Sequence, residues 1–235
     1  MKNVTGYDVP KLAAGSWGRL FAMTELTLKV MPRPEMTATI AIAALDPHQA
    51  VRTMASAMGS QGEVAAAAHR PATGGMSAFT AIRVEGFRPS VTARLHLLER
   101  LLASFGPVDV LDDDAARLFW GDLQTLRPLA GDRALWRVNI PPSAGAGLVE
   151  TLADQGADWM LDWAGGLAWL AFDGDPALVR ATAAAAGGHA VLVRASAERR
   201  AVVPAFHAPT PALAALEERV RRAFDPKGIF ETGRF

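Results

Sequence analysis

The sequence predicts an α+β fold in which tandem β-α-β units share one antiparallel sheet with helices on one face. The chain has 235 residues, half of them hydrophobic, so it is long enough to bury a sizeable core. Apolar residues alternate in some segments, as in strands, and recur at helical spacing in others. These segments follow one another in a β-α-β-β-α-β order over residues 36–111, and a similar order recurs up to residue 194. We therefore expect two units joined in a continuous sheet.

The first unit begins with an alternating segment at 36–44, which is typical of a strand. Asp46 and Pro47 then open a helix that runs to about Met58, with the aspartate as N-cap and the proline in the first turn. The pattern next predicts two strands, a helix and a third strand at 63–69, 77–85, 89–104 and 108–111. This is the order of a ferredoxin-like split unit.

The second unit has the same kinds of segment. The pattern predicts helices at 112–126, 143–155 and 175–186 and strands at 134–140, 158–162, 167–172 and 189–194. Ser143 is the expected N-cap of the middle helix. Residues 196–210 show no periodicity and are expected to form a loop, whereas residues 211–224 have one apolar stripe and are expected to be helical.

Tryptophan is frequent in the predicted core. We interpret five of the six tryptophans as one aromatic core layer, with a ligand pocket as the alternative: Trp120, Trp136, Trp159, Trp163 and Trp169.

Composition excludes several functions. The 24 basic and 24 acidic residues balance, which gives no indication of a nucleic-acid or anionic-membrane partner. The absence of cysteine excludes disulfides, thiolate metal sites and iron–sulfur ligation by this chain. No window approaches about 18 apolar residues and no signal-peptide pattern is present, so a cytoplasmic protein without a membrane span is expected.

Known catalytic patterns are also missing. His189 and His207 have no second ligand at metal-binding spacing, so no metal site is expected. The sequence contains no recognisable Ser-His-Asp set, phosphate-binding P-loop or pair of catalytic carboxylates.

The opening stretch has an unusual composition. Glycines at positions 6, 15 and 18 alternate with small residues and precede an alternating run at 26–30. This pattern predicts a tight loop, a short helix, a glycine-rich turn and a strand. Because glycine has no Cβ, such backbone can approach a flat or anionic ligand closely. The alternative is an ordinary glycine-rich loop between two elements.

Two terminal motifs resemble a known family. The segment from K-N-V-T-G-Y-D at residues 2–8 to T-E at 24–25 is similar to the end of the FAD-binding domain of vanillyl-alcohol-oxidase-type flavoproteins. Residues 224–234, F-D-P-K-G-I-F-E-T-G-R, resemble the closing motif of that family, F-D-P-x-G-I-F-N-P-G-R. Residues 161–169 and 186–190 are similar to the E subunits of bacterial glycolate oxidases in particular. The resemblance covers the whole chain.

Pro32-Arg33-Pro34 interrupts the chain, because proline fixes φ and cannot donate to a strand ladder, and we place a domain boundary there. By the resemblance, residues 1–34 would be the C-terminal remnant of an FAD-binding (PCMH-type) domain, and residues 35–235 an FAD-linked oxidase C-terminal domain. Family members carry a long segment before this motif, with the glycine-rich loop that holds the pyrophosphate. We therefore expect that this chain alone does not hold FAD.

The resemblance also implies a set of site residues. Those expected beside the FAD cofactor are Asn3, Gly6, Tyr7, Asp8, Gly15, Ser16, Gly18, Leu20, Ala22, Met23, Glu231 and Gly233. Arg234 could reach a carboxylate substrate, or it could be a surface arginine. Three residues depart from the family pattern: Trp17 replaces a smaller residue, Phe21 replaces a glycine and would crowd a bound cofactor, and Glu231 replaces an asparagine.

The function implied is that of the C-terminal portion of the FAD-binding subunit of a glycolate oxidase-like 2-hydroxy-acid dehydrogenase. Such a complex oxidises glycolate to glyoxylate by hydride transfer to flavin and includes a further flavin subunit and an iron–sulfur subunit. No catalytic residue is assigned in this chain. One alternative is a structural or interaction subunit that no longer binds flavin. Another is a small-ligand sensor, which would need a closed apolar pocket among the tryptophans.

Overall fold

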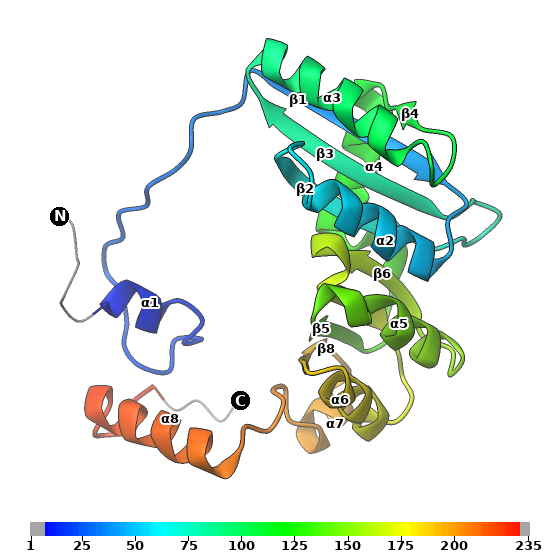
Figure 1. Cartoon of the computed structure of the whole chain (residues 1–235). Helices are drawn as coiled ribbons and strands as arrows, with labels where there is room; N and C mark the ends of the chain where they lie inside the picture. Colours follow the sequence, from blue (N-terminus) through cyan, green and yellow to red (C-terminus); the bar gives the residue numbers. More distant parts are fainter. Residues whose placement is uncertain (1–7, 231–235) are drawn as a thin grey trace. The chain divides into compact units, whose positions relative to one another are not determined.

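The computed structural model describes residues 8–230, which divide into two compact units (Figure 1). The larger unit, Pro32–His207, contains the sheet. The smaller unit combines the segment that ends at Met31 with the segment that begins at Ala208, and it contains α1 (Val9–Ala13) and α8 (Pro211–Phe224).

The sheet has eight strands in the order β4-β1-β3-β2-β6-β7-β5-β8, and each neighbouring pair is antiparallel. The strands are β1 (Met36–Ala43), β2 (Val64–Arg70), β3 (Phe79–Gly86), β4 (Asp109–Val110), β5 (Leu135–Asn139), β6 (Asp158–Asp162), β7 (Leu167–Ala171) and β8 (His189–Arg194). The first four and the last four form the two halves of the sheet. The predicted fold class, tandem units in one antiparallel sheet, is confirmed.

One face of the sheet carries the main helical layer and the largest core. This layer consists of α2 (Pro47–Met58), α3 (Arg88–Leu102), α5 (Gly145–Ala153) and α6 (Pro176–Ala185). Figure 1 shows α2, α3 and α5 in front of the strands. In α2 the predicted cap is present as a full capping box, because the Asp46 carboxylate accepts from the Gln49 backbone N–H and the Gln49 side chain accepts from the Asp46 N–H.

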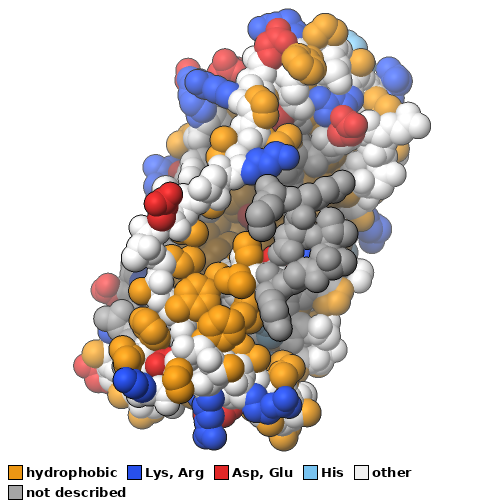
Figure 2. Space-filling view, turned by 90° about the vertical axis from the view of Figure 1, so that its left-hand side faces the viewer, with side chains coloured by type: hydrophobic (Ala, Val, Ile, Leu, Met, Phe, Trp, Pro, Cys, Tyr) orange, Lys and Arg blue, Asp and Glu red, His pale blue; other side chains and the backbone are white. Residues whose placement is uncertain are grey.

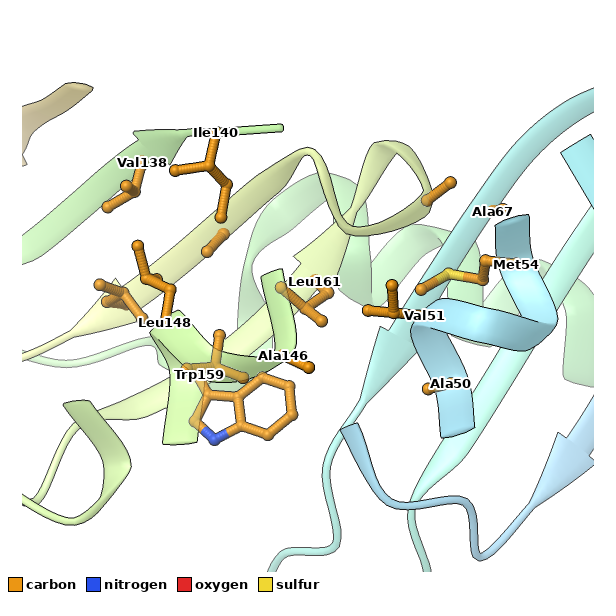
Figure 3. Close-up of a cluster of buried hydrophobic side chains, with 14 of the residues drawn as sticks. Ala50, Val51, Met54, Ala67, Val138, Ile140, Ala146, Leu148, Trp159 and Leu161 are labelled. Carbon is orange, nitrogen blue, oxygen red and sulfur yellow. The ribbon is translucent and has the colours of Figure 1, made fainter. Parts of the chain in front are cut away.

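The core continues across the junction between the two halves of the sheet. Strands β2 and β6 share one register pair, His69 with Leu161, so backbone pairing there is sparse. Buried side chains join the halves instead: Val51 of α2 lies near Leu161 of β6, and Ala146 of α5 belongs to the same cluster (Figure 3). Burial of apolar surface therefore holds the two units together.

A second helical layer, which the sequence did not predict, covers part of the other face. Helix α4 (Asp113–Thr125) buries Phe119 against Ala68 and Ala81, whose small side chains leave room for the ring. The indole N–H of Trp120 donates to Thr39 Oγ1 at 3.0 Å. The sheet is therefore buried on both faces along α4.

The tryptophans do not form the single layer that was expected. Trp136 and Trp159 are buried in the helix-covered core, whereas Trp120 and Trp169 are half-buried with the clusters on the opposite face. Trp163 is exposed. Successive residues of a strand point to opposite faces of the sheet, and this alternation distributes the tryptophans between the two faces.

Three local predictions are wrong. Residues 196–210 include a short helix, α7 (Ala197–Val202), whose N-cap is Ser196. Ser143 lies inside a 3₁₀ turn, η2 (Pro142–Ala144), and does not cap α5. Residues 26–30 form no strand; Leu26, Leu28 and Val30 are 63%, 77% and 78% exposed, and a strand requires a partner strand for its backbone hydrogen bonds.

Two further 3₁₀ turns complete the larger unit: η1 (Arg127–Leu129), which follows α4, and η3 (Trp163–Gly165), which joins β6 to β7. Among the helices of residues 8–230, none combines the length and apolar character needed to cross a membrane.

Candidate functional site

The residues predicted to contact a cofactor lie at the two ends of the chain. Five of them fall outside the described residues: Asn3, Gly6, Tyr7, Glu231 and Gly233. Arg234, the candidate for binding the substrate carboxylate, also lies outside them. The other seven lie close together in sequence in the smaller unit, just before or after α1: Asp8, Gly15, Ser16, Gly18, Leu20, Ala22 and Met23.

Asp8 has a local structural role as the N-cap of α1. Its carboxylate accepts from the Lys11 backbone N–H at 3.4 Å and forms an ion pair with Lys11 Nζ at 2.8 Å. The side-chain hydrogen bond from Lys11 lowers the pKa of Asp8, so the carboxylate is charged at neutral pH. A charged aspartate at this position satisfies a free N–H of the first helical turn.

The glycine-rich turn after α1 is built from left-handed backbone. Gly15 has φ +83°, Trp17 +55° and Gly18 +73°. A Cβ placed on either glycine would meet nothing within 4 Å, so the backbone conformation, and not close packing, requires glycine there. The main chain of the turn is open on that side.

The side chains after the turn differ in burial. Leu20 is buried, whereas Ala22 and Met23 are exposed. The Phe21 ring, which stands at a glycine position of the family motif, packs on Phe224 of α8 with ring centroids 5.6 Å apart. Phe21 therefore has a hydrophobic partner within its own unit.

The second terminal motif folds into a turn closed by Asp225. Its carboxylate is buried and accepts from the backbone N–H groups of Ile229 at 2.9 Å and Phe230 at 2.7 Å. Gly228 supplies the left-handed residue of this turn at φ +65°. Sequence analysis did not assign a role to Asp225; an aspartate followed by Pro-x-Gly is a signal of such a side-chain-closed turn.

The smaller unit exposes several large apolar side chains. Those of the segment before Met31 include Trp17, Met23, Leu26, Leu28 and Val30. Exposed hydrophobic side chains are visible at the surface in Figure 2. Apolar surface of this kind is typical of chains that bind other proteins.

The larger unit contains a separate cleft of about 910 Å³ next to α4. Two of the tryptophans considered for a ligand pocket, Trp120 and Trp163, line it together with Arg83 and Asp162. No group of three or more His, Asp or Glu side chains within residues 8–230 is arranged to hold a metal ion.

The fold is similar to that of an alkyldihydroxyacetonephosphate synthase. No family model matches the chain. Two crystal forms of an alkyldihydroxyacetonephosphate synthase superpose on 97% of the chain and 50% of the synthase, with TM-scores of 0.57 and 0.56 at 14% and 13% identity. At this identity the comparison establishes the fold alone.

A sequence comparison defines the relationship more closely. The chain is 30% identical over 240 aligned residues to glycolate oxidase subunit GlcE of Escherichia coli (strain K12). The alignment covers 100% of the chain and 59% of the relative, so the chain spans somewhat more than half of that protein. The chain is thus a relative of the E subunit of glycolate oxidase, and the resemblance predicted from the sequence motifs is confirmed.

Proposed function

We propose that this chain is part of the FAD-binding subunit of a glycolate oxidase-like 2-hydroxy-acid dehydrogenase and contributes to its flavin site. The observation that carries the proposal is the similarity of the whole chain to glycolate oxidase subunit GlcE. Glycolate would be the substrate and glyoxylate the product. Electrons would pass to an iron–sulfur subunit, and the complex would lie in the cytoplasm.

The chain would contribute main-chain contacts at the glycine-rich turn. Bound FAD would supply the hydride acceptor for oxidation of the 2-hydroxy acid. Gly15 and Gly18 present open backbone in the left-handed conformation, which supports a role in approaching the cofactor. Asp8, Ser16, Leu20, Ala22 and Met23 would shape this contact, together with Asn3, Gly6, Tyr7, Glu231 and Gly233. Arg234 would bind the substrate carboxylate.

Deletion and complementation in the organism that encodes the chain test this proposal. We expect deletion to abolish glycolate-dependent dye reduction in cell extracts, and the wild-type chain to restore it. Gly18→Val should fail to restore it, because a β-branched residue is strained at φ +73° and its side chain would occupy the open backbone surface.

Gly74→Val is the matched control for this experiment. Gly74 also has positive φ, +55°, and open space around its Cβ position, but it lies in the β2–β3 loop of the larger unit. The control should restore dye reduction. If deletion leaves glycolate-dependent dye reduction unchanged, the proposed function is wrong.

A structural subunit without flavin is the second candidate. The packing of Phe21 on Phe224 and the exposed apolar side chains of the smaller unit favour it. In that case deletion should still abolish activity, whereas both Gly18→Val and Gly74→Val should restore it. The Gly18 variant therefore separates the two candidates.

The purified chain alone should not retain FAD. The seven described residues lie in and around one open turn, which would form only one side of a binding site and would exclude little water. We expect gel filtration after incubation with FAD to give a colourless protein peak. A stoichiometric yellow peak would show that the chain holds the cofactor without a partner.

A further inference from the structure

The cleft beside α4 is lined by residues of the larger unit alone. Its walls come from the first half of β2, from β3, from α4 and from η3. With about 910 Å³, it is within the size range of pockets that hold complete organic ligands, and it is much larger than a two-carbon acid requires.

Strand geometry explains why a hollow exists there. Beyond the single pair of His69 with Leu161, β2 separates from β6, and a register irregularity occurs in β2 between Val64 and Ala66. The residues of β2 that line the cleft, Ala65, Ala66 and Ala67, have small side chains. Strand separation and alanine together leave space that larger side chains would fill.

Two indoles form aromatic walls of the cleft. Trp120 is held by its hydrogen bond to Thr39. Trp163 is 57% exposed although it lies in a tightly fixed turn. The Asp162 carboxylate accepts from the Trp163 backbone N–H at 2.7 Å, and a Cβ on Gly165 would come within 2.9 Å of the Pro142 carbonyl oxygen.

The backbone at Trp163 is strained. Trp163 and Ala164 have φ values of +51° and +56°, a region that residues with a Cβ rarely occupy. The surrounding contacts maintain this conformation and keep the indole at the surface of the cleft. Strain of this kind is frequent where a side chain is positioned for a ligand.

Cationic groups lie next to both indoles. The Arg83 guanidinium is 4.9 Å from the Trp120 ring centroid, and that of Arg137 is 5.3 Å from the Trp163 centroid. Arg83 pairs with Glu85 through Nε at 2.9 Å, whereas Arg137 has no carboxylate partner among residues 8–230. A guanidinium has five N–H donors, so one carboxylate leaves Arg83 with capacity for a ligand anion.

The cleft also contains one carboxylate, that of Asp162. Burial raises the pKa of Asp162, against the lowering effects of the Trp163 N–H bond and the Arg83 charge. The Trp163 backbone N–H donates a hydrogen bond to one of its carboxylate oxygens. The lining combines arginine donors and this carboxylate with flat apolar surfaces.

The geometry points to a binding site for an aromatic carboxylate, with its anionic group at Arg83 and its ring beside Trp120 and Trp163. Guanidinium groups recognise carboxylates by paired hydrogen bonds, and indoles bind flat rings by stacking. This site does not depend on flavin or on the oxidation of a 2-hydroxy acid.

Calorimetric titration of the full chain with 2-naphthoate tests the site. We expect one molecule to bind per chain, and the neutral isostere 2-naphthamide to bind at least about tenfold more weakly because it lacks the charge that Arg83 recognises. Cyclohexanecarboxylate, which keeps the charge but has no aromatic ring, should also bind more weakly. Equal affinity for naphthoate and naphthamide would contradict recognition of an anion.

Variants locate the binding. Arg83→Gln and Trp163→Ala should each weaken naphthoate binding about tenfold or more, whereas the surface controls Arg88→Gln and Phe87→Ala should not change it. Phe87 and Arg88 are exposed and lie outside the cleft lining.

A cleft-filling variant separates binding from folding. Gly121 lines the cleft on α4, and a Cβ there would meet nothing within 4 Å. Gly121→Phe should therefore keep the circular dichroism spectrum and thermal midpoint while abolishing naphthoate binding. No detectable naphthoate binding by the wild-type chain, or unchanged binding by folded Gly121→Phe, would overturn the proposal.

Discussion

His69 shows most clearly how a single residue departs from the pattern of its strand. It lies in an alanine-rich segment of β2, is 1% exposed, and stacks on Trp159 with ring centroids 5.6 Å apart. Its Nδ1 lies 2.9 Å from Thr80 Oγ1, and its Nε2 has no hydrogen-bond partner within the described residues. Sequence analysis did not single it out, because one histidine in an apolar strand gives no periodic signal.

The buried imidazole makes stability depend on pH. Burial lowers the pKa of His69 from 6.5 to about 4, so the folded protein resists a proton that the unfolded chain accepts. Stability from this group is complete above pH 6.5 and decreases as the pH falls towards 4, by up to roughly 3 kcal/mol. Urea unfolding of wild type and His69→Gln at pH 7.5 and 4.5 measures the difference.

The quantity to compare is the change in unfolding free energy between pH 7.5 and 4.5 in each variant, because other groups also titrate in this range. The loss of unfolding free energy on acidification should be smaller in His69→Gln than in wild type. His48, a half-exposed histidine on α2 paired with Glu150, provides the control variant His48→Gln. An identical pH dependence in wild type and His69→Gln would show that His69 is not kept neutral by the fold.

Among the helices, α4 was predicted from the sequence, but the face of the sheet that it covers was not. Its residues carry a helical pattern, and Asp112 is the N-cap that accepts from the Ala115 N–H at 2.8 Å. The pattern does not show which face of the sheet the helix covers. That choice depends on Ala68 and Ala81, small residues that are register partners on the neighbouring strands β2 and β3. Such complementarity becomes visible only once the strand register is known.

Shortening the side chain of Phe119 to that of alanine tests the role of α4. Phe119 is 8% exposed and packs on Ala68 and Ala81, whereas its neighbour Leu118 is 58% exposed. Phe119→Ala should lower the free energy of unfolding by about 3 kcal/mol, since it leaves a cavity, and Leu118→Ala should change it by less than about 1 kcal/mol. Urea unfolding measures both. Equal effects would show that α4 is not packed on the sheet.

Helix α5 offers a test of close backbone approach. A Cβ on Gly145 would come within 2.5 Å of the Gly165 carbonyl oxygen, which belongs to the η3 turn, whereas a Cβ on Gly147 would meet nothing within 4 Å. Gly145→Ala should therefore lower the thermal midpoint by several degrees, because backbone must move to admit the methyl group.

Gly147→Ala is the matched control in the same helix. It should leave the thermal midpoint unchanged or raise it slightly, since alanine is the better helix former. Similar midpoints for the two alanine variants would mean that α5 and η3 are not in close contact.

Other elements show where sequence patterns are sufficient. The N-cap of α2 and the strand β1 depend on patterns of neighbouring residues, and both were predicted correctly. The run at 26–30 alternates equally well but has no partner strand in the structure. Alternation of apolar residues therefore indicates a preference for strand structure, but a strand forms only where a partner strand is present.

For the whole molecule, the large core explains why the two sheet halves behave as one unit despite a single backbone pair between β2 and β6. The order of the tandem units was predictable because it follows from the order of the segments. The cleft was not, since it arises where β2 separates from β6 and brings together α4 and η3, which are distant in sequence. The sequence motifs indicated the resemblance to glycolate oxidase E subunits, and the similarity to subunit GlcE confirms it.

The most direct test of the proposed function is the flavin content of the complex that carries this chain. The chain should be tagged in the organism that encodes it and purified with its bound partners. We predict that the purified complex contains FAD and an iron–sulfur protein and reduces a dye when glycolate is added. A complex without flavin, or one that oxidises no 2-hydroxy acid, would contradict the proposal.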